Sequence, residues 1–79
     1  MSPDEIGELL HQHPFVPLRL HLGNGMHFDV RHPDMAIVGG EHMAIGVVRE
    51  GSSEPLIKLI SLINLHVIEP VPEAERTAG

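Results

Sequence analysis

The residues of this chain best suited to chemistry are its histidines, because imidazole is a common ligand for zinc, copper and nickel. The pair His21 and His27 is the best placed, since the surrounding pattern predicts two opposed strands with Asp29 one step diagonal on the same face. His21, His27 and Asp29 are therefore the candidate metal ligands. Solvated surface histidines are the simpler interpretation, which we favour because the chain has no His-Glu-x-x-His or equivalent signature. The seven histidines are His11, His13, His21, His27, His32, His42 and His66.

Two alternating segments, 18–22 and 26–30, must position this pair. Apolar and polar residues alternate in both, and Gly23-Asn24-Gly25 lies between them. This pattern predicts two half-buried antiparallel strands. A two-residue loop would mix apolar and polar side chains on one face, whereas a three-residue loop with Gly25 in the left-handed conformation keeps the apolar residues together. We expect the second register, which places Arg19 opposite Asp29 and His21 opposite His27 on the outer face.

Catalysis has weaker support than metal binding. His32-Pro33-Asp34 could supply part of a catalytic dyad, but a turn in which Asp34 caps backbone N–H groups is the simpler interpretation. The candidate nucleophiles Ser52, Ser53 and Ser61 lie in no nucleophile-elbow or oxyanion-loop context. We therefore expect a protein that is not an enzyme and that needs no cofactor.

Composition excludes several classes of partner. Five Lys and Arg stand against 11 Asp and Glu, a formal net charge of -6, which opposes binding to DNA, RNA and anionic membranes. Two Phe and no Tyr or Trp leave few rings on which bases could stack. The absence of cysteine removes disulfides and thiolate metal sites, and no apolar run is long enough to span a bilayer. We expect a cytoplasmic protein that does not bind membranes.

Element signals predict a mainly β fold with one N-terminal helix. Ser2, Pro3 and Glu5 form a capping-box start for a helix over residues 3–12. Strands follow at 18–22, 26–30, 35–38, 43–48, 56–60 and 65–71. A short helix before five or six short strands indicates a small, strongly bent antiparallel barrel of SH3-like or Sm-like type. We expect one domain over residues 1–71, with the barrel at 15–71, and a disordered tail at 72–79.

The segment 56–68 is apolar at both strand parities. Such a strand is either covered twice within the fold or covers a partner subunit. In a chain this small we expect the second, and therefore a homo-oligomer. The expected interface residues are Leu56, Ile57, Leu59, Ile60, Leu65 and Val67.

Two resemblances bear on these expectations. The line His13-Pro14-Phe15-Val16-Pro17-Leu18-Arg19-Leu20, with Val30-Arg31-His32-Pro33-Asp34-Met35, resembles a group of small bacterial proteins of uncharacterised activity. The helix, the strand and turn at 16–25, and the strands at 56–71 are weakly similar to the bacterial Sm-like RNA chaperone. That family carries a Lys-His dipeptide at its RNA site, whereas here Lys58 is followed by Leu59. The shared helix and strands of the second resemblance imply a small barrel able to form a ring, and the missing dipeptide argues against the RNA site of that family.

Together these patterns favour a non-enzymatic interaction or assembly module that forms homo-oligomers through strand edges or the C-terminal apolar strands. An Sm-like RNA-binding ring is the first alternative. A metal-binding protein using His21 and His27 is the second.

Overall fold

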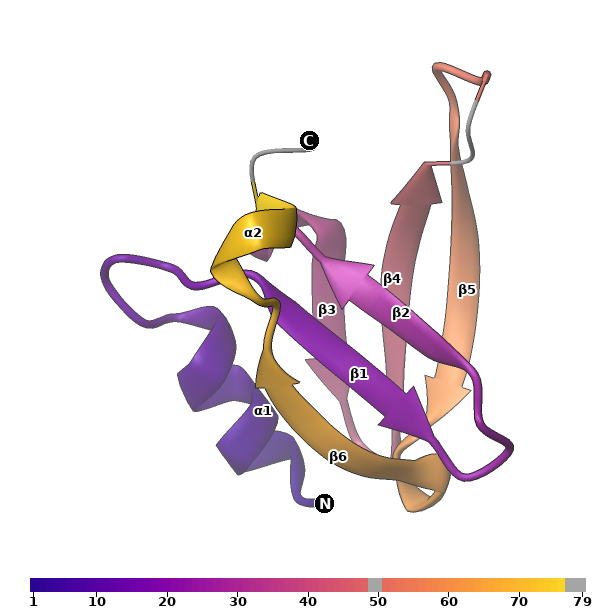
Figure 1. Cartoon of the computed structure of the whole chain (residues 1–79). Coiled ribbons are helices and arrows are strands. Elements are labelled where there is room, and N and C mark those ends of the chain that lie inside the picture. Colours follow the sequence, from indigo (N-terminus) through magenta and orange to yellow (C-terminus); the bar gives the residue numbers. More distant parts are fainter. Residues whose placement is uncertain (49–50, 77–79) are drawn as a thin grey trace.

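A computed structural model describes residues 1–48 and 51–76 of the chain. Two three-stranded antiparallel sheets lie against each other (Figure 1), one with the order β2-β1-β6 and the other with the order β3-β4-β5. The predicted mainly β fold with a short N-terminal helix is confirmed. The strands are β1 (Leu18–Leu22), β2 (His27–Val30), β3 (Ala36–Gly39), β4 (His42–Val48), β5 (Pro55–Ser61) and β6 (Leu65–Pro70).

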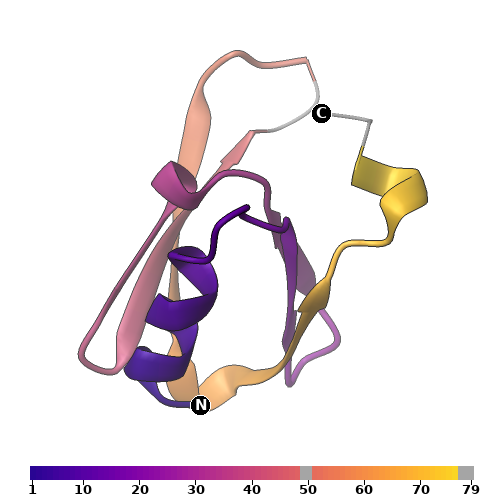
Figure 2. The same cartoon turned by 90° about the vertical axis from the view of Figure 1, so that its left-hand side faces the viewer.

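Helix α1 (Pro3–Leu10) begins as the sequence predicts, because the Ser2 side chain accepts from the backbone N–H of Glu5 while the Glu5 side chain reaches back to Ser2. These hydrogen bonds hold the pKa of Glu5 below its ordinary value. The helix ends at Leu10, two residues earlier than expected. His11 caps the end, with its Nδ1 at 2.7 Å from the carbonyl oxygen of Gly7. Ile6 and Leu10 are buried, and α1 contacts β3 along the side of the molecule between the two sheets (Figure 2).

The β1–β2 hairpin has the expected register. Leu18 lies opposite Val30, Leu20 opposite Phe28, and His21 opposite His27. The loop is closed by a hydrogen bond from the Leu22 N–H to the Met26 carbonyl at 2.9 Å, and Gly25 has a φ of 87°. The three-residue loop is therefore confirmed, and with it the separation of apolar and polar faces.

Two short 3-10 helices connect the sheets. Between β2 and β3, η1 (Pro33–Met35) occupies the turn predicted at His32-Pro33-Asp34, and η2 (Leu62–Asn64) joins β5 to β6. The core lies between the sheets and under α1. Its buried residues are Ile6, Leu10, Leu18, Leu20, Val30, Ala36, Met43, Ile45, Ile60, Leu62, Leu65 and Val71.

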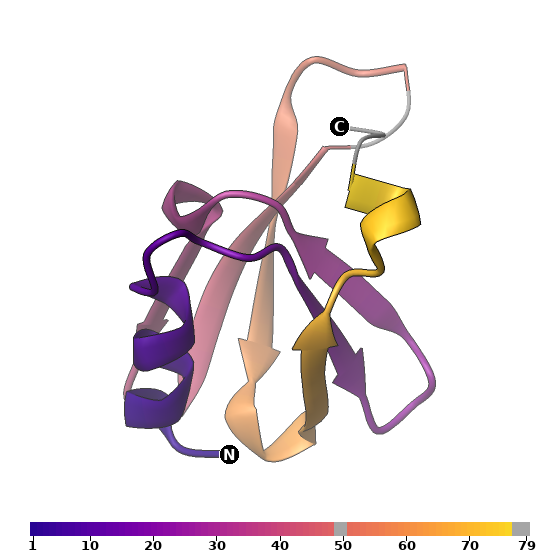
Figure 3. The same ribbon diagram turned by 60° about the vertical axis from the view of Figure 1, so that its left-hand side comes forward.

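The C-terminal segment differs from the disordered tail expected at residues 72–79. Glu73–Arg76 forms a short helix, α2, on the side of the molecule away from α1 (Figure 3), and Arg19 and Arg31 across the sheet both bind it. Residues 77–79 of that expected tail lie outside the described residues, as do residues 49 and 50 of the expected loop before β5. Within the described chain, no helix is both long and apolar enough to cross a membrane.

Candidate functional site

The outer faces of the two sheets have opposite chemistry. On the β2–β1–β6 sheet, the outer positions form a mainly polar face, which we term the polar face, made of Arg19, His21, His27, Asp29 and Glu69 together with the exposed Val67. The outer positions of the β3–β4–β5 sheet are nearly all apolar. The alternation of residues in each strand places one set of side chains in the shared core and the other on these two surfaces.

The centre of the polar face is a two-point ion pair between Arg19 and Asp29. The Arg19 Nε lies 2.8 Å from Asp29 Oδ1, and its second terminal nitrogen lies 3.1 Å from Oδ2. Arg31 approaches the same carboxylate at 3.3 Å. The Arg19 hydrogen bond outweighs the partial burial of Asp29, so the pKa of Asp29 is lowered, and the pKa of Arg19 is raised by Asp29 and Glu75. The cross-strand pair predicted from the hairpin register is thus present.

The structure brings His21 and His27 together but does not complete the expected metal site with Asp29. The two imidazole centroids are 5.9 Å apart and tilted by 46°. Nε2 of His21 lies 2.9 Å from a carboxylate oxygen of Glu69, a residue that the sequence did not associate with it. Asp29 is directed instead to Arg19 and Arg31, whose charges compete with a cation. Among the residues described, no group of three His, Asp or Glu side chains is arranged to hold a metal ion.

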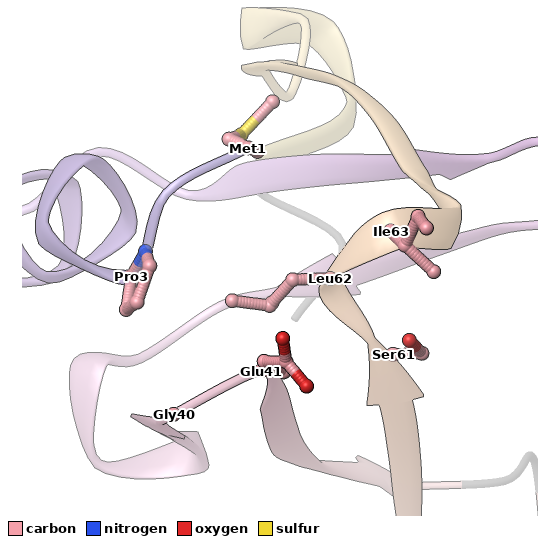
Figure 4. A pocket seen from close by; sticks show the side chains of 7 residues that line it. All are labelled: Met1, Pro3, Gly40, Glu41, Ser61, Leu62 and Ile63. Carbon is pink, nitrogen blue, oxygen red and sulfur yellow. The ribbon is translucent and has the colours of Figure 1, made fainter.

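The motifs considered for catalysis have structural roles. The His32 carbonyl accepts a hydrogen bond from the Met35 N–H at 3.0 Å, which closes η1. Ser52 Oγ accepts from the Glu54 N–H within the loop before β5. A hollow of about 420 Å³ beside Ser61 has Glu41 as its only ionisable side chain (Figure 4), and it is otherwise lined by Met1, Pro3, Gly40, Leu62 and Ile63. Among the described residues, no hydrogen bond joins Ser61 to Glu41, and the Ser52 hydroxyl bonds only within its own loop.

A second hollow brings two sequence motifs together. It measures about 480 Å³ and lies between the end of α1 and the η1–β3 segment. His13 and Phe15 of the first motif line it together with Pro33 and Asp34 of the second. The sequence alone gave no reason to place these two motifs side by side.

The outer positions of the β3–β4–β5 sheet form what we term the apolar face: Ile37, Ala44, Gly46, Val48, Ile57 and Leu59. Ile37, Ala44 and Leu59 are aligned in one row across the three strands. Ile37 is 73% exposed, Ile57 67% and Leu59 76%. The remaining outer positions of these strands, Gly39, His42, Pro55 and Ser61, carry no carboxylate, ammonium or guanidinium group. The face is therefore both exposed and free of fixed charge.

Gly46 shapes this face. A Cβ at position 46 would lie 2.7 Å from the Cε of Met35, so the Met35 side chain occupies the space that the missing side chain leaves. The half-buried Met35 comes from η1 and thus extends the apolar surface beyond the strands.

The expected oligomer interface is corrected in part. Ile60 and Leu65 are 4% and 3% exposed, because their side chains point between the two sheets, and they cannot contact a partner. Leu56 is half-buried at an inner position, and Val67 is exposed on the other sheet. Of the six expected residues, Ile57 and Leu59 lie on the apolar face.

Ile37 belongs to the same face but was missing from the expected interface. Its segment, Met35 to Val38, is uniformly apolar, so the sequence does not reveal which parity faces outward.

A comparison with known proteins finds no matching family model, no similar curated protein and no similar solved structure.

Proposed function

We propose that this protein is a non-enzymatic assembly module that binds a second copy of itself through the apolar face. The observation that carries this proposal is the row of Ile37, Ala44 and Leu59 across three strands, in which Ile37 and Leu59 are exposed and Ala44 is half-buried, with no charged residue among the outer positions. Water-exposed apolar surface of this kind is a source of association free energy.

The charge distribution favours a second copy as the occupant. The chain carries a formal net charge of -6, so most ways of bringing two copies together place carboxylates near carboxylates. Two apolar faces can meet without opposing any fixed charges. An isologous pair of this kind is also the commonest form of protein oligomer.

Face-to-face packing is favoured over pairing through the edge of β5. Lys58 lies in the middle of this edge strand at an inner position, yet it is exposed. A lysine on an edge strand, particularly an inward-pointing one, hinders the addition of another strand. Of the two routes that the sequence left open, strand edges and apolar strands, this observation favours the apolar strands at the β5 edge.

The area of the apolar face sets the expected affinity of the proposed dimer. Neighbouring strands lie about 4.8 Å apart and rise about 3.3 Å per residue. Three strands of at most seven residues therefore give the apolar face an area of roughly 14 by 23 Å, or about 300 Å². A stable interface buries about 800 Å² per partner, so this face supports a weak, concentration-dependent dimer. We expect a dissociation constant in the range of about 10⁻⁴ M.

We further propose that the two sheets are halves of a small barrel of SH3-like or Sm-like type. Two observations support this proposal. The chain passes through η1 from β2 in one sheet to β3 in the other, where a barrel would have one bent strand. In addition, β2 contacts β4 in the opposite sheet. At the other end, η2 carries the chain directly from β5 to β6. Such an architecture leaves its interior filled by side chains, in keeping with a binding role rather than a catalytic one.

The proposed dimer is tested by sedimentation equilibrium between about 10 µM and 1 mM. We expect the average mass to rise with concentration for the native chain. Leu59→Lys should weaken association at least tenfold, because it buries an unpaired ammonium group in the interface. This change also lowers the net negative charge, so greater repulsion between whole molecules cannot account for the loss.

Ile63→Lys is the matched control, since Ile63 is 83% exposed and lies on η2, outside the apolar face. It introduces the same charge and should leave the association unchanged. A native chain that stays monomeric at about 1 mM would refute the proposal, as would equal effects of the two substitutions.

A further inference from the structure

Helix α2 docks on the polar face through one glutamate residue that is held at two places. The terminal nitrogen of Arg19 lies 2.8 Å from the Glu75 carboxylate, and a terminal nitrogen of Arg31 donates to the Glu75 backbone carbonyl at 3.0 Å. Arg19 on β1 and Arg31, which directly follows β2, therefore contact both the side chain and the main chain of the same residue. This is a geometry suited to a glutamate within a peptide.

Nothing in α2 itself is buried. The Glu75 side chain is 51% exposed, whereas the Arg19 side chain that binds it is 14% exposed. Val71, just before the helix, is completely buried and anchors the chain at that point. The polar contacts beyond Val71 can thus break without disturbing the core, and an ion pair in which the carboxylate is half exposed is screened by water.

The site would remain organised if α2 left. Asp29 holds Arg19 at two points and also contacts Arg31, so both guanidinium groups keep a fixed support. Arg19 and Arg31 would then face solvent beside Asp29 and beside Glu69, which lies opposite Arg19 in the sheet, so the two positive charges would be balanced locally in a chain whose net charge is -6. The guanidinium N–H groups that now donate to Glu75 would be left without a protein acceptor.

We propose that Arg19 and Arg31 form a binding site for a glutamate residue of an acidic peptide segment in a partner protein, and that α2 occupies this site and limits access to it. The contact at the backbone carbonyl favours a peptide over a free anion. The net negative charge of the chain opposes any anion, and it opposes a polyanion such as RNA more strongly than a peptide that carries one or two carboxylates. This site lies on the opposite sheet from the apolar face and does not depend on self-association.

The probe for this site is the blocked hexapeptide with the sequence of residues 71–76, titrated into the full ¹⁵N-labelled chain while the Nε–Hε signal of Arg19 is followed by NMR. Glu75→Ala removes the competing carboxylate, and we expect it to raise the apparent affinity for the peptide at least about fivefold over the native chain. Glu73→Ala is the matched control, because Glu73 is 90% exposed and, among the described residues, its carboxylate forms an ion pair with Arg76 alone, at 3.9 Å. It should bind the peptide as the native chain does.

Two further measurements decide the specificity. Arg31→Gln in the Glu75→Ala chain should reduce peptide binding, and because the Arg31 side chain is 33% exposed this substitution spares the core. A peptide with Gln in place of the glutamate at position 75 should bind more weakly. The proposal is overturned if the Glu75→Ala chain shows no peptide-dependent shift, or if inorganic phosphate binds as tightly as the peptide.

Discussion

At the scale of single residues, the Arg19–Asp29 pair stabilises the hairpin in a pH-dependent way. Arg19 lowers the pKa of Asp29 below its ordinary value near 3.8, so the ionised form is favoured in the folded state. The stabilisation is therefore fully present above about pH 4 and is lost as the pH falls through the lowered pKa. At neutral pH, both oxygens of Asp29 remain paired with a guanidinium group.

We expect Asp29→Asn to lower the free energy of unfolding by about 1–3 kcal/mol at pH 7, because a charge-assisted pair with limited exposure is broken. The difference between the native and variant chains should shrink between about pH 4 and pH 2. Urea unfolding at several pH values measures both quantities.

Glu8→Gln is the control for this prediction, since Glu8 is exposed on α1 and forms no ion pair with any residue that the structure describes. It should change stability little at any pH. If the difference between the native chain and the Asp29→Asn variant stayed constant down to about pH 2, Arg19 would not be the source of the acid sensitivity.

At the scale of elements, two glycines have opposite roles. Gly25 closes the β1–β2 loop with a φ of 87°, a region that costs an ordinary residue about 1–2 kcal/mol. Gly7 lies inside α1, and a Cβ there would meet no atom within 4 Å. Its lack of a side chain only weakens the helix.

We therefore expect Gly25→Ala to lower the melting temperature by about 4–8 °C or more, since about 1 kcal/mol corresponds to that shift in a domain of this size. Gly7→Ala should raise the melting temperature by up to a similar amount, because alanine is favoured in a helix by about 1 kcal/mol. Circular dichroism melts provide the measurement. Equal shifts of the same sign would show that the loop conformation is not the cause.

At the scale of the whole molecule, net charge and the apolar face act against each other. Each copy carries a formal charge of -6, and the proposed contact surface carries none. Added salt screens the repulsion between copies and leaves apolar association intact. We expect the dimer dissociation constant to fall by severalfold between about 50 and 500 mM NaCl, as measured by sedimentation. Weaker association at high salt would instead indicate an interface made of ion pairs.

The same charge predicts poor binding of RNA by the native chain. Phosphates would approach a surface with an excess of carboxylates, and the two Phe residues are both partly buried. We expect single-stranded RNA to bind no more tightly than about 10⁻⁴ M at physiological salt, near the weak end of nonspecific binding. Fluorescence anisotropy with a labelled oligonucleotide checks this, and a submicromolar affinity would contradict it.

The sequence by itself determined the local features of this protein. Alternation around a glycine loop specified the hairpin register, because a slip of one residue would have exposed its apolar face. The same register predicted the Arg19–Asp29 pair. Ser2, Pro3 and Glu5 specified the start of α1, since capping depends on neighbours three residues apart.

Tertiary structure alone decided which apolar side chains are buried. Residues 56–68 are apolar at both parities, so only the position of the other sheet directs Ile60 inward and Leu59 outward. Likewise, Glu75 is separated from Arg19 by 56 residues, and no local signal links them. The apolar face and the docking of α2 both arise from contacts between segments distant in the chain, which periodicity and capping patterns do not encode.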